Sequence, residues 1–223
     1  MARHFLTMSD VSEAELRRLL EVTARLKHNR RSPQALVDKT VALVFQKPSM
    51  RTRVAFEVAV LQLGGSVISL GQEDIQLGTR EPIKDVARVL SRYVDASVVR
   101  TFAHRDAEEF AAYAGVPVIN GLSDLVHTCQ VLADLFTVQE HIGRLKGLRL
   151  SYVGDGNNVL HSLLEGCGML GISLTAATPS RYRPHASIWN AAAKRAKAHG
   201  ASLHWTDDPH HAVQGADVIY TDV

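Results

Sequence analysis

The chain has 223 residues, of which 46% are hydrophobic and 22% are charged, and this globular composition excludes a disordered or collagen-like protein. A chain of this length forms one large domain or two small ones. Its 25 Lys and Arg residues nearly balance its 23 Asp and Glu residues. The net charge of +2 therefore gives no electrostatic reason to expect binding to nucleic acid or to an anionic membrane.

Two further features of the sequence indicate the cellular compartment of the protein. Cys129 and Cys167 have neither a CxxC spacing nor the spacing of a zinc site, which favours two reduced thiols packed on helices. The first ten residues lack the apolar region of a signal peptide, and no apolar run approaches the roughly 18 residues of a membrane-spanning helix. We therefore expect a cytoplasmic protein without a membrane partner.

The first part of the chain alternates between strand and helix patterns. Ser12 and Glu15 have the spacing of a capping box at the start of an amphipathic helix. Gly64 is a signal for the end of a helix, and Pro82 suits the first turn of another. We expect strands at residues 41–45, 67–70, 97–100 and 116–119, and helices at residues 54–63, after Pro82, at 106–114 and at 124–142.

The same alternation restarts after a break at residues 143–147 that contains two glycines. We expect strands at residues 148–153, 172–176, 202–205 and 218–221, and helices at residues 158–170, 186–199 and 209–213. Strands that alternate with helices predict βαβ units, so the expected fold is α/β with two domains, 1–142 and 143–223, each a parallel sheet flanked by helices. A parallel strand is normally followed by a covering helix, so we expect the second domain, which stops after its fourth strand, to be incomplete.

The segment QKPSMRTR at residues 46–53 is the strongest candidate for a binding site. In open α/β sheets ligands bind beyond the carboxyl ends of the strands, and this segment follows such an end and leads into a helix. Free N–H groups at a helix start favour an anion, and Arg51 can bind a phosphate with two hydrogen bonds. The pattern predicts a phosphate site, with a solvated basic helix start as the alternative.

Two other strand ends carry polar residues. Arg100 ends the expected strand at 97–100, and the residues Asn120 to Asp124 follow the strand at 116–119. His127 and Gln130 are three residues apart and would share one face of the next helix. Each of these signals alone is typical of a solvated surface, but together they could line one crevice that has the phosphate site at its floor.

The segment Gly154-Asp155-Gly156-Asn157-Asn158 invites a dinucleotide-binding interpretation, but the sequence argues against it. The third glycine of that motif is replaced by Val159, and no acidic residue ends a strand about 20 residues later. Side-chain amides at a strand end are better suited to a carboxylate or to the backbone groups of an amino acid.

Several separated segments resemble the aspartate/ornithine carbamoyltransferase family. The segment FQKPSMRTR at residues 45–53 is similar to the family's carbamoyl-phosphate loop. The segments DIQLG (74–78), VRTF (99–102) and HTCQ (127–130) follow in the family's order, and GDGNN (154–158) is typical of its ornithine branch. The resemblance extends along essentially the whole chain.

The resemblance implies a carbamoyltransferase-like fold and a specific reaction. Carbamoyl phosphate would bind the first domain and L-ornithine the second, and carbamoyl transfer to the ornithine δ-amine would give citrulline and phosphate. The family usually forms homotrimers with active sites at subunit interfaces, and no metal or organic cofactor is expected.

The resemblance also assigns roles to individual residues of this chain. Three residues are expected to be catalytic, namely Arg51, Arg100 and His127. Carbamoyl phosphate is expected to bind Ser49, Met50, Arg51, Thr52, Gln76, Arg100, His127 and Gln130, with Gln76 reaching into a neighbouring subunit's site. Ornithine is expected to bind Asn158 and Asp222.

Three departures from the family pattern bear on activity. Met50 stands where the family usually has Thr, which removes a hydroxyl ligand for phosphate and leaves the backbone N–H. Thr128 replaces the Pro of the family's H-P-x-Q segment. The family's Ser-Met-Gly loop, its His-Cys-Leu-Pro segment and its last helix would lie beyond Val223, so we expect a C-terminally truncated chain with poor activity alone.

Two other functions are compatible with these departures. One is a carbamoyltransferase that acts on another amino acid. The other is a truncated, non-catalytic paralogue that binds phosphate or a partner subunit.

Overall fold

A computed structural model describes residues 2–28 and 33–222, so the expected chain end at Val223 lies outside the described residues. The backbone separates into two compact units. Unit 1 comprises the residues up to Asp10 together with Arg25–Asp124, and unit 2 comprises Val11–Ala24 together with the residues from Leu125 onward. The expected division into substrate-binding domains at 142/143 stays a prediction, because backbone compactness does not show which residues bind which substrate.

Unit 1 contains a four-stranded parallel sheet with the strand order β2-β1-β3-β4 among the described residues. The strands are β1 (Thr40–Phe45), β2 (Ser66–Leu70), β3 (Ala96–Arg100) and β4 (Val118–Leu122). The helices are α2 (Met50–Gln62), α3 (Gln72–Ile75), α4 (Ile83–Leu90) and α5 (His104–Tyr113), with a 3-10 turn at Met8–Asp10. From β1 the chain continues to β2, which pairs with one side of β1, and then crosses to β3, which pairs with the other side. The direction in which successive strands are added to the sheet therefore reverses at β1.

Alternating side chains of β1 supply both cores of unit 1. Val41, Leu43 and Phe45 pack on one face with Val60 of α2. Ala42 and Val44 point to the other face, where α4 and α5 contribute the buried residues Ile83, Val86, Ala87, Ala107, Phe110 and Ala111. Because both faces are covered, the strand reads as a continuous apolar run.

Unit 2 contains a second parallel sheet, whose described strands have the order β7-β6-β5-β8. The strands are β5 (Arg149–Gly154), β6 (Ser173–Ala177), β7 (Leu203–Thr206) and β8 (Val218–Asp222). The helices are α6 (Thr128–Ile142), α7 (Asn158–Leu170), α8 (Ala186–Ala198) and α9 (Pro209–Val213), with a 3-10 turn at Ser180–Tyr182, and unit 2 also holds most of α1 (Glu13–His28). The order of this sheet reverses at β5, as that of unit 1 reverses at β1.

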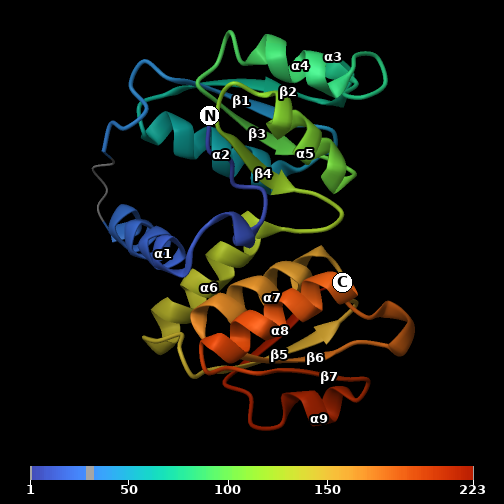
Figure 1. The fold of residues 1–223 in the computed structure, drawn as a ribbon. Coiled ribbons are helices and arrows are strands. Elements are labelled where there is room, and N and C mark those ends of the chain that lie inside the picture. Colours follow the sequence, from blue (N-terminus) through green and yellow to red (C-terminus); the bar gives the residue numbers. More distant parts are fainter. Residues whose placement is uncertain (1, 29–32, 223) are drawn as a thin grey trace. The chain divides into compact units, whose positions relative to one another are not determined.

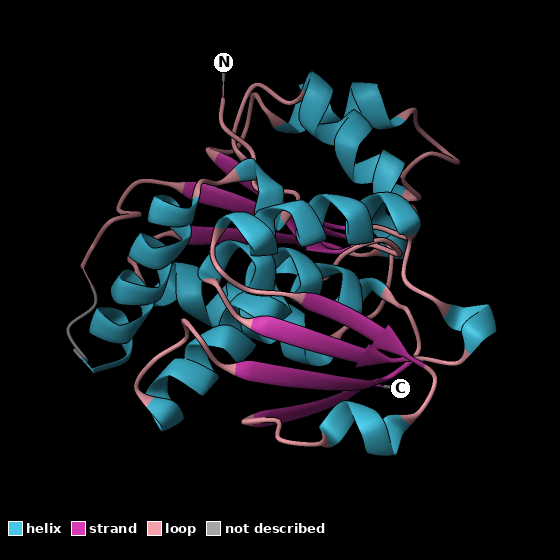
Figure 2. Cartoon of the chain, turned by 60° about the horizontal axis from the view of Figure 1, so that its bottom comes forward, coloured by secondary structure: helices cyan, strands magenta, loops and turns pink. Residues whose placement is uncertain are grey.

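Helix α7 is the central helix of unit 2. Every residue from Val159 to Leu170 is buried, because the helix packs on α6, on α8 and on the sheet. Figure 1 shows α7 and α8 on one face of this sheet and α9 on the other, and Figure 2 shows the four strands side by side. Gly171 ends α7 in the left-handed conformation, which favours glycine.

The expected fold class is confirmed, and three expected elements have a boundary that differs from the expectation by three residues or more. Helix α2 begins at Met50, four residues before its expected start. Strand β4 covers Val118–Leu122 and not residues 116–119, and α6 begins at Thr128 and not at residue 124. Within the described residues, no helix is long and apolar enough to cross a membrane.

Candidate functional site

The first turn of α2 holds four of the expected phosphate ligands. Ser49 is the N-cap residue, with an extended backbone, and its side chain accepts a hydrogen bond of 3.3 Å from the N–H of Thr52. Met50 is 78% exposed and Arg51 is also exposed. The N–H groups at this start have no partner within the helix, and the helix dipole adds a partial positive charge there.

Arg100 lies beside this helix start at the end of the neighbouring strand. It is paired with Phe45 in the register between β1 and β3, and its Nη1 donates a hydrogen bond of 3.2 Å to the hydroxyl of Thr52. Its Nε is buried and has no hydrogen-bond partner among the described residues. Burial lowers the pKa of the guanidinium, but an arginine remains charged in proteins. The structure thus joins a fixed positive charge to a helix N-terminus.

Gln46 organises this edge of the sheet, although no role was expected for its side chain. Its backbone N–H donates to the carbonyl of Arg100 at 2.9 Å. Its side-chain Oε1 accepts from the N–H of Phe102 at 2.9 Å, and its Nε2 donates to the carbonyl of Leu77 at 3.0 Å. One buried amide therefore ties together three segments that are far apart in the sequence. Its only sequence signal was its place directly after β1.

Gln76 lies in the loop after α3 and has a left-handed backbone with a φ of 48°. A non-glycine residue in this region is uncommon and strained. The side chain is exposed, and together with Gln46, Thr79 and Arg105 it lines an open cavity of about 1040 Å³ within unit 1. Its expected reach into a neighbouring subunit stays a prediction.

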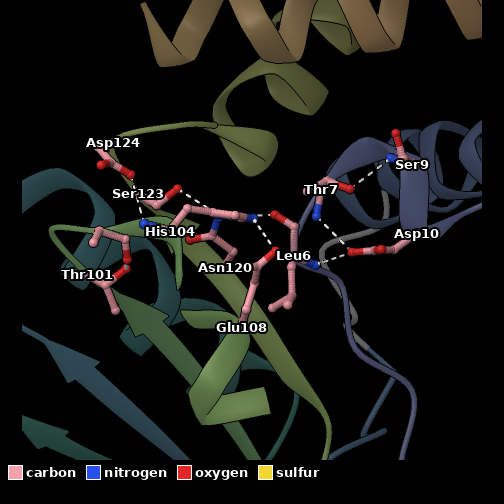
Figure 3. A network of polar contacts seen from close by, with 11 residues as sticks. Leu6, Thr7, Ser9, Asp10, Thr101, His104, Glu108, Asn120, Ser123 and Asp124 are labelled. Atoms are coloured by element: carbon pink, nitrogen blue, oxygen red, sulfur yellow. Dashed lines mark hydrogen bonds and ion pairs between the residues drawn. The ribbon is translucent and has the colours of Figure 1, made fainter. Parts of the chain in front are cut away.

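The polar residues around the end of β4 hold unit 1 together. Asn120 lies inside the strand, and its side-chain amide donates to the carbonyl of Leu6 at 3.1 Å. Ser123 and Asp124 contact His104 at the start of α5, where the N–H of His104 donates to Asp124 at 2.8 Å. Figure 3 shows these contacts as one network that extends to Asp10. These residues have structural contacts within unit 1, and the expectation that they line a ligand crevice stays a prediction.

In unit 2, His127 occupies the N-cap position of α6 and not a position within the helix. Its N–H donates to the hydroxyl of Ser162 on α7 at 2.9 Å. Gln130 is exposed in the first turn of α6, and its Nε2 donates to Asp134 one turn further on at 2.9 Å. Thr128, which replaces a family proline, is buried. His127 and Gln130 thus lie at the start of one helix, with His127 held by a contact to α7.

His161 fixes the segment that leads to His127. Its Nδ1 lies 2.8 Å from the carbonyl of Leu125, and its Nε2 accepts a hydrogen bond of 2.9 Å from the N–H of His185. Because Nε2 accepts, the proton of the neutral ring sits on Nδ1. Burial lowers the pKa of His161, with nearby His185 as a lesser cause of the same sign. No motif in the sequence singles out His161.

The two residues expected to bind ornithine lie at the start of α7 and at the end of β8. Asn158 is the first residue of α7, and Asp222 ends β8. The preceding Asn157 caps α7, since its Oδ1 accepts from the N–H groups of Val159 and Leu160 at 3.0 and 3.1 Å. The other end of the Asn157 amide donates to Asp222 at 2.7 Å. Asn157 is one of the two side-chain amides that the sequence suggested for an amino-acid ligand, and in the structure it orients the Asp222 carboxylate.

The glycines of this segment serve the packing of the protein chain. The N–H of Gly156 donates to the carbonyl of Tyr182 at 2.7 Å, and a Cβ at Gly156 would collide with the backbone of Arg183 and Pro184. A Cβ at Gly154 would lie 2.7 Å from the carbonyl oxygen of Asp222. The space that a dinucleotide motif keeps for a pyrophosphate is thus filled here by the protein's own chain.

Two tyrosines, Tyr152 and Tyr220, lie close to the carboxylates of Asp222 and Asp134. Tyr152 and Tyr220 stack with ring centroids 6.1 Å apart, and the hydroxyl of Tyr220 donates to Asp134 at 2.9 Å. Burial, and then the charge of Asp222, raises the pKa of Tyr152. Burial and then the charge of Asp134 raise the pKa of Tyr220. Both hydroxyls therefore remain protonated donors over the physiological range.

Within the described ranges, no three His, Cys, Asp or Glu side chains are grouped so that they could hold a metal ion. The expectation that no metal or organic cofactor is needed stays a prediction.

Two family models match the chain. The carbamoyl-phosphate-binding domain of the aspartate/ornithine carbamoyltransferases matches residues 3–140. The aspartate/ornithine-binding domain of the same family matches residues 146–223.

Individual proteins match over the same length. An ornithine carbamoyltransferase of Gloeobacter violaceus is 50% identical over 218 residues, which are 98% of this chain and 69% of that protein. One from Bacillus subtilis is 48% identical over 99% of this chain and 69% of its own length. The structure of the ornithine carbamoyltransferase of Pyrococcus furiosus has a TM-score of 0.96 at 46% identity, and it matches over 100% of this chain and 72% of that one.

These matches cover both units and almost every residue of the chain, while the relatives themselves are longer. The chain belongs to the aspartate/ornithine carbamoyltransferase family.

Proposed function

We propose that the chain transfers the carbamoyl group of carbamoyl phosphate to the δ-amine of L-ornithine, with citrulline and phosphate as products. The observation that carries the proposal is the pairing of Arg100 with Thr52 at the start of α2, which leaves a buried guanidinium N–H without a partner among the described residues. A fixed cation beside a helix N-terminus is suited to a phosphate. The name shared by the relatives supplies the substrates.

The phosphate would be held by the first turn of α2 and by Arg100. Ser49 and Thr52 offer hydroxyls, Met50 offers its backbone N–H, and the exposed Arg51 is available for two parallel hydrogen bonds to phosphate oxygens. As the carbamoyl carbon is attacked and the phosphate departs, negative charge grows on the leaving group, and the guanidiniums of Arg51 and Arg100 stabilise it.

His127 and Gln130 would bind the carbamoyl group, and Gln76 would complete the site from a neighbouring subunit. In this role His127 donates to the carbonyl oxygen as charge develops there. The family's usual homotrimer is part of the proposal, because the role of Gln76 requires a second copy of the chain. The cytoplasmic location expected from the sequence stays a prediction.

Ornithine would bind through Asn158 and Asp222. An amide is suited to the substrate carboxylate, and the Asp222 carboxylate is suited to the α-amino group, since Asn157 already orients it. The δ-amine, whose pKa resembles that of lysine at about 10.4, must lose a proton before it can attack. Holding both substrates in a reactive arrangement can contribute roughly 7–11 kcal/mol in the best cases.

The test is a calorimetric titration with carbamoyl phosphate alongside a citrulline assay with ornithine, aspartate and other amino acids as acceptors. Binding and citrulline formation specific to ornithine support the proposal. Turnover with another amino acid would assign a different carbamoyltransferase, and binding without any turnover would indicate the non-catalytic paralogue. Absence of binding would remove the phosphate site itself.

A further inference from the structure

Asp134 is a partly buried carboxylate with no role in the reaction described above. It lies on α6 one turn after Gln130, whose Nε2 donates to its Oδ1 at 2.9 Å. The hydroxyl of Tyr220, on β8, donates to its Oδ2 at 2.9 Å. Each carboxylate oxygen therefore has its own donor, and the two donors come from different elements of unit 2.

This arrangement fixes which end of the Gln130 amide is used within the protein. A glutamine amide has a donating NH₂ group and an accepting oxygen, and an ionised carboxylate only accepts. The NH₂ group of Gln130 is therefore turned toward Asp134. Because the Gln130 side chain is exposed, its Oε1 remains available to a ligand as an acceptor.

Tyr220 binds the oxygen of Asp134 that does not contact Gln130. Its ring stacks on Tyr152, and its strand continues to Asp222 two residues later. Burial raises the pKa of Asp134, while the hydrogen bonds from Gln130 and Tyr220 lower it. The two donors thus offset part of the cost of keeping a partly buried carboxylate charged.

We propose that Asp134 is a positioning residue that holds Gln130 with its Oε1 toward the substrate, where it accepts a hydrogen bond from the carbamoyl NH₂ group. This inference rests on the proposed function, because it takes carbamoyl phosphate as the ligand of Gln130. It assigns Asp134 a role in specificity. Acetyl phosphate has the same shape with a methyl group in place of the NH₂ group, so it leaves that acceptor unsatisfied.

Two stable ligands separate this role from general binding. Phosphonoacetamide keeps the NH₂ group, and acetonylphosphonate carries a methyl group in its place; inorganic phosphate reports on the phosphate site alone. The dissociation constant of each is measured calorimetrically for the 223-residue chain. The wild-type chain is expected to bind phosphonoacetamide about tenfold more tightly than acetonylphosphonate.

Asp134→Ala removes the acceptor and frees the amide of Gln130 to rotate. We expect the preference for phosphonoacetamide to fall about tenfold, with the affinities for acetonylphosphonate and inorganic phosphate changed by less than about twofold. Asp134→Asn, which keeps the side-chain shape, should give an intermediate loss and carries the test if the alanine variant does not fold. Tyr220→Phe is the matched control, because it removes the other hydrogen bond of Asp134 and should keep most of the preference.

The preference for phosphonoacetamide over acetonylphosphonate must also depend on Gln130 itself. In a Gln130→Ala background, Asp134→Asn is expected to cause no further loss of preference, since its effect passes through that amide. An equal loss of affinity for all three ligands, or an unchanged preference in both Asp134 variants, would overturn the inference and leave the proposed function standing. If the wild-type chain binds neither inorganic phosphate nor phosphonoacetamide, the proposed function fails and the inference fails with it.

Discussion

The starts of α2 and α7 are equivalent positions in their units, yet they are built for different purposes. Each helix follows an interior strand of a parallel sheet, and each lies where the strand order reverses, at β1 or at β5. Ligands of open α/β sheets bind at such reversals. Both helix starts also carry a cap residue, Ser49 in α2 and Asn157 in α7.

The difference lies in how much of each start the protein already uses. Ser49 makes a single capping bond of 3.3 Å, and the next two residues are exposed beside Arg100. Asn157 makes two capping bonds, and its amide also binds Asp222. The start of α2 is therefore open to an anion, whereas the start of α7 is occupied by the protein's own groups and orients a carboxylate. The position in a fold indicates where a ligand can bind, and the unused hydrogen-bonding groups indicate which ligand.

The largest effect is expected at the open helix start. Arg51→Ala should weaken binding of carbamoyl phosphate at least about a hundredfold, because it removes an exposed guanidinium that can form two hydrogen bonds to the phosphate. Arg53→Ala is the matched control two residues away. Arg53 already pairs with Glu57 at 2.9 Å, so its loss should change affinity little. Similar affinities for Arg51→Ala and wild type in a calorimetric titration would falsify the phosphate assignment.

The occupied helix start should matter more for stability. Asn157→Ala is expected to lower the free energy of unfolding by about 1–2 kcal/mol, since it removes two capping bonds and the partner of Asp222. Ser49→Ala removes one longer bond and should cost about 0.5 kcal/mol. Urea unfolding of both variants measures the difference. Equal losses would show that the two helix starts are stabilised in the same way.

The link between Thr52 and Arg100 should have a moderate effect on binding. Thr52→Val removes the hydroxyl that accepts from Arg100, and the affinity for carbamoyl phosphate is expected to fall about fivefold to tenfold. Thr52→Ser keeps the hydroxyl and should bind nearly as tightly as the wild type. The prediction is contradicted if the serine variant loses as much affinity as the valine variant.

The smallest effect concerns acid stability of unit 2. Burial lowers the pKa of His161, so below the unfolded value of about 6.5 the unfolded chain binds a proton that the native chain does not. This contribution to stability is present above pH 6.5 and is lost as the pH falls below that value. His161→Asn can still donate to the carbonyl of Leu125 and should lack this loss. The difference in unfolding free energy between the wild type and the His161→Asn variant should be constant above pH 7 and should change below it.

Local signals in the sequence predicted most of the fold. The bounds of α7 and α9 agree with the expectation, because Asn157, Gly171 and the Asp208-Pro209 pair mark the helix ends within a few residues. The capping box of α1 is also present, with the N–H of Ser12 donating to Glu15 at 2.8 Å.

The errors arise where distant residues decide a boundary. Strand β4 continues past residue 119 because Phe5 pairs beside Ile119 and Asn120 donates to Leu6. The start of α6 is delayed, and its N-cap His127 is held by Ser162, which lies 35 residues further along. No local pattern contains these partners.

The residues of the candidate site also divide into those that the local sequence indicates and those that depend on a distant partner. The segment from Ser49 to Thr52 was predicted because its residue types and its place after β1 are both visible in the sequence. Gln46 and Asp134 were missed, because each acts through a partner that only the fold brings near. The contact between Asp134 and Tyr220 joins residues that are 86 positions apart.

The bridge between Phe5 and Ile119 has a practical consequence for anyone who expresses the protein. The N–H of Phe5 donates to the carbonyl of Val118 at 2.8 Å, and the carbonyl of Phe5 accepts from the N–H of Asn120 at 2.9 Å. The N-terminal residues therefore pair with the outer margin of the sheet, along its edge strand β4. A purification tag fused directly before them would crowd that margin, and trimming them would expose backbone groups that recruit strands from other molecules. A spacer ahead of Ala2 is therefore the safer design.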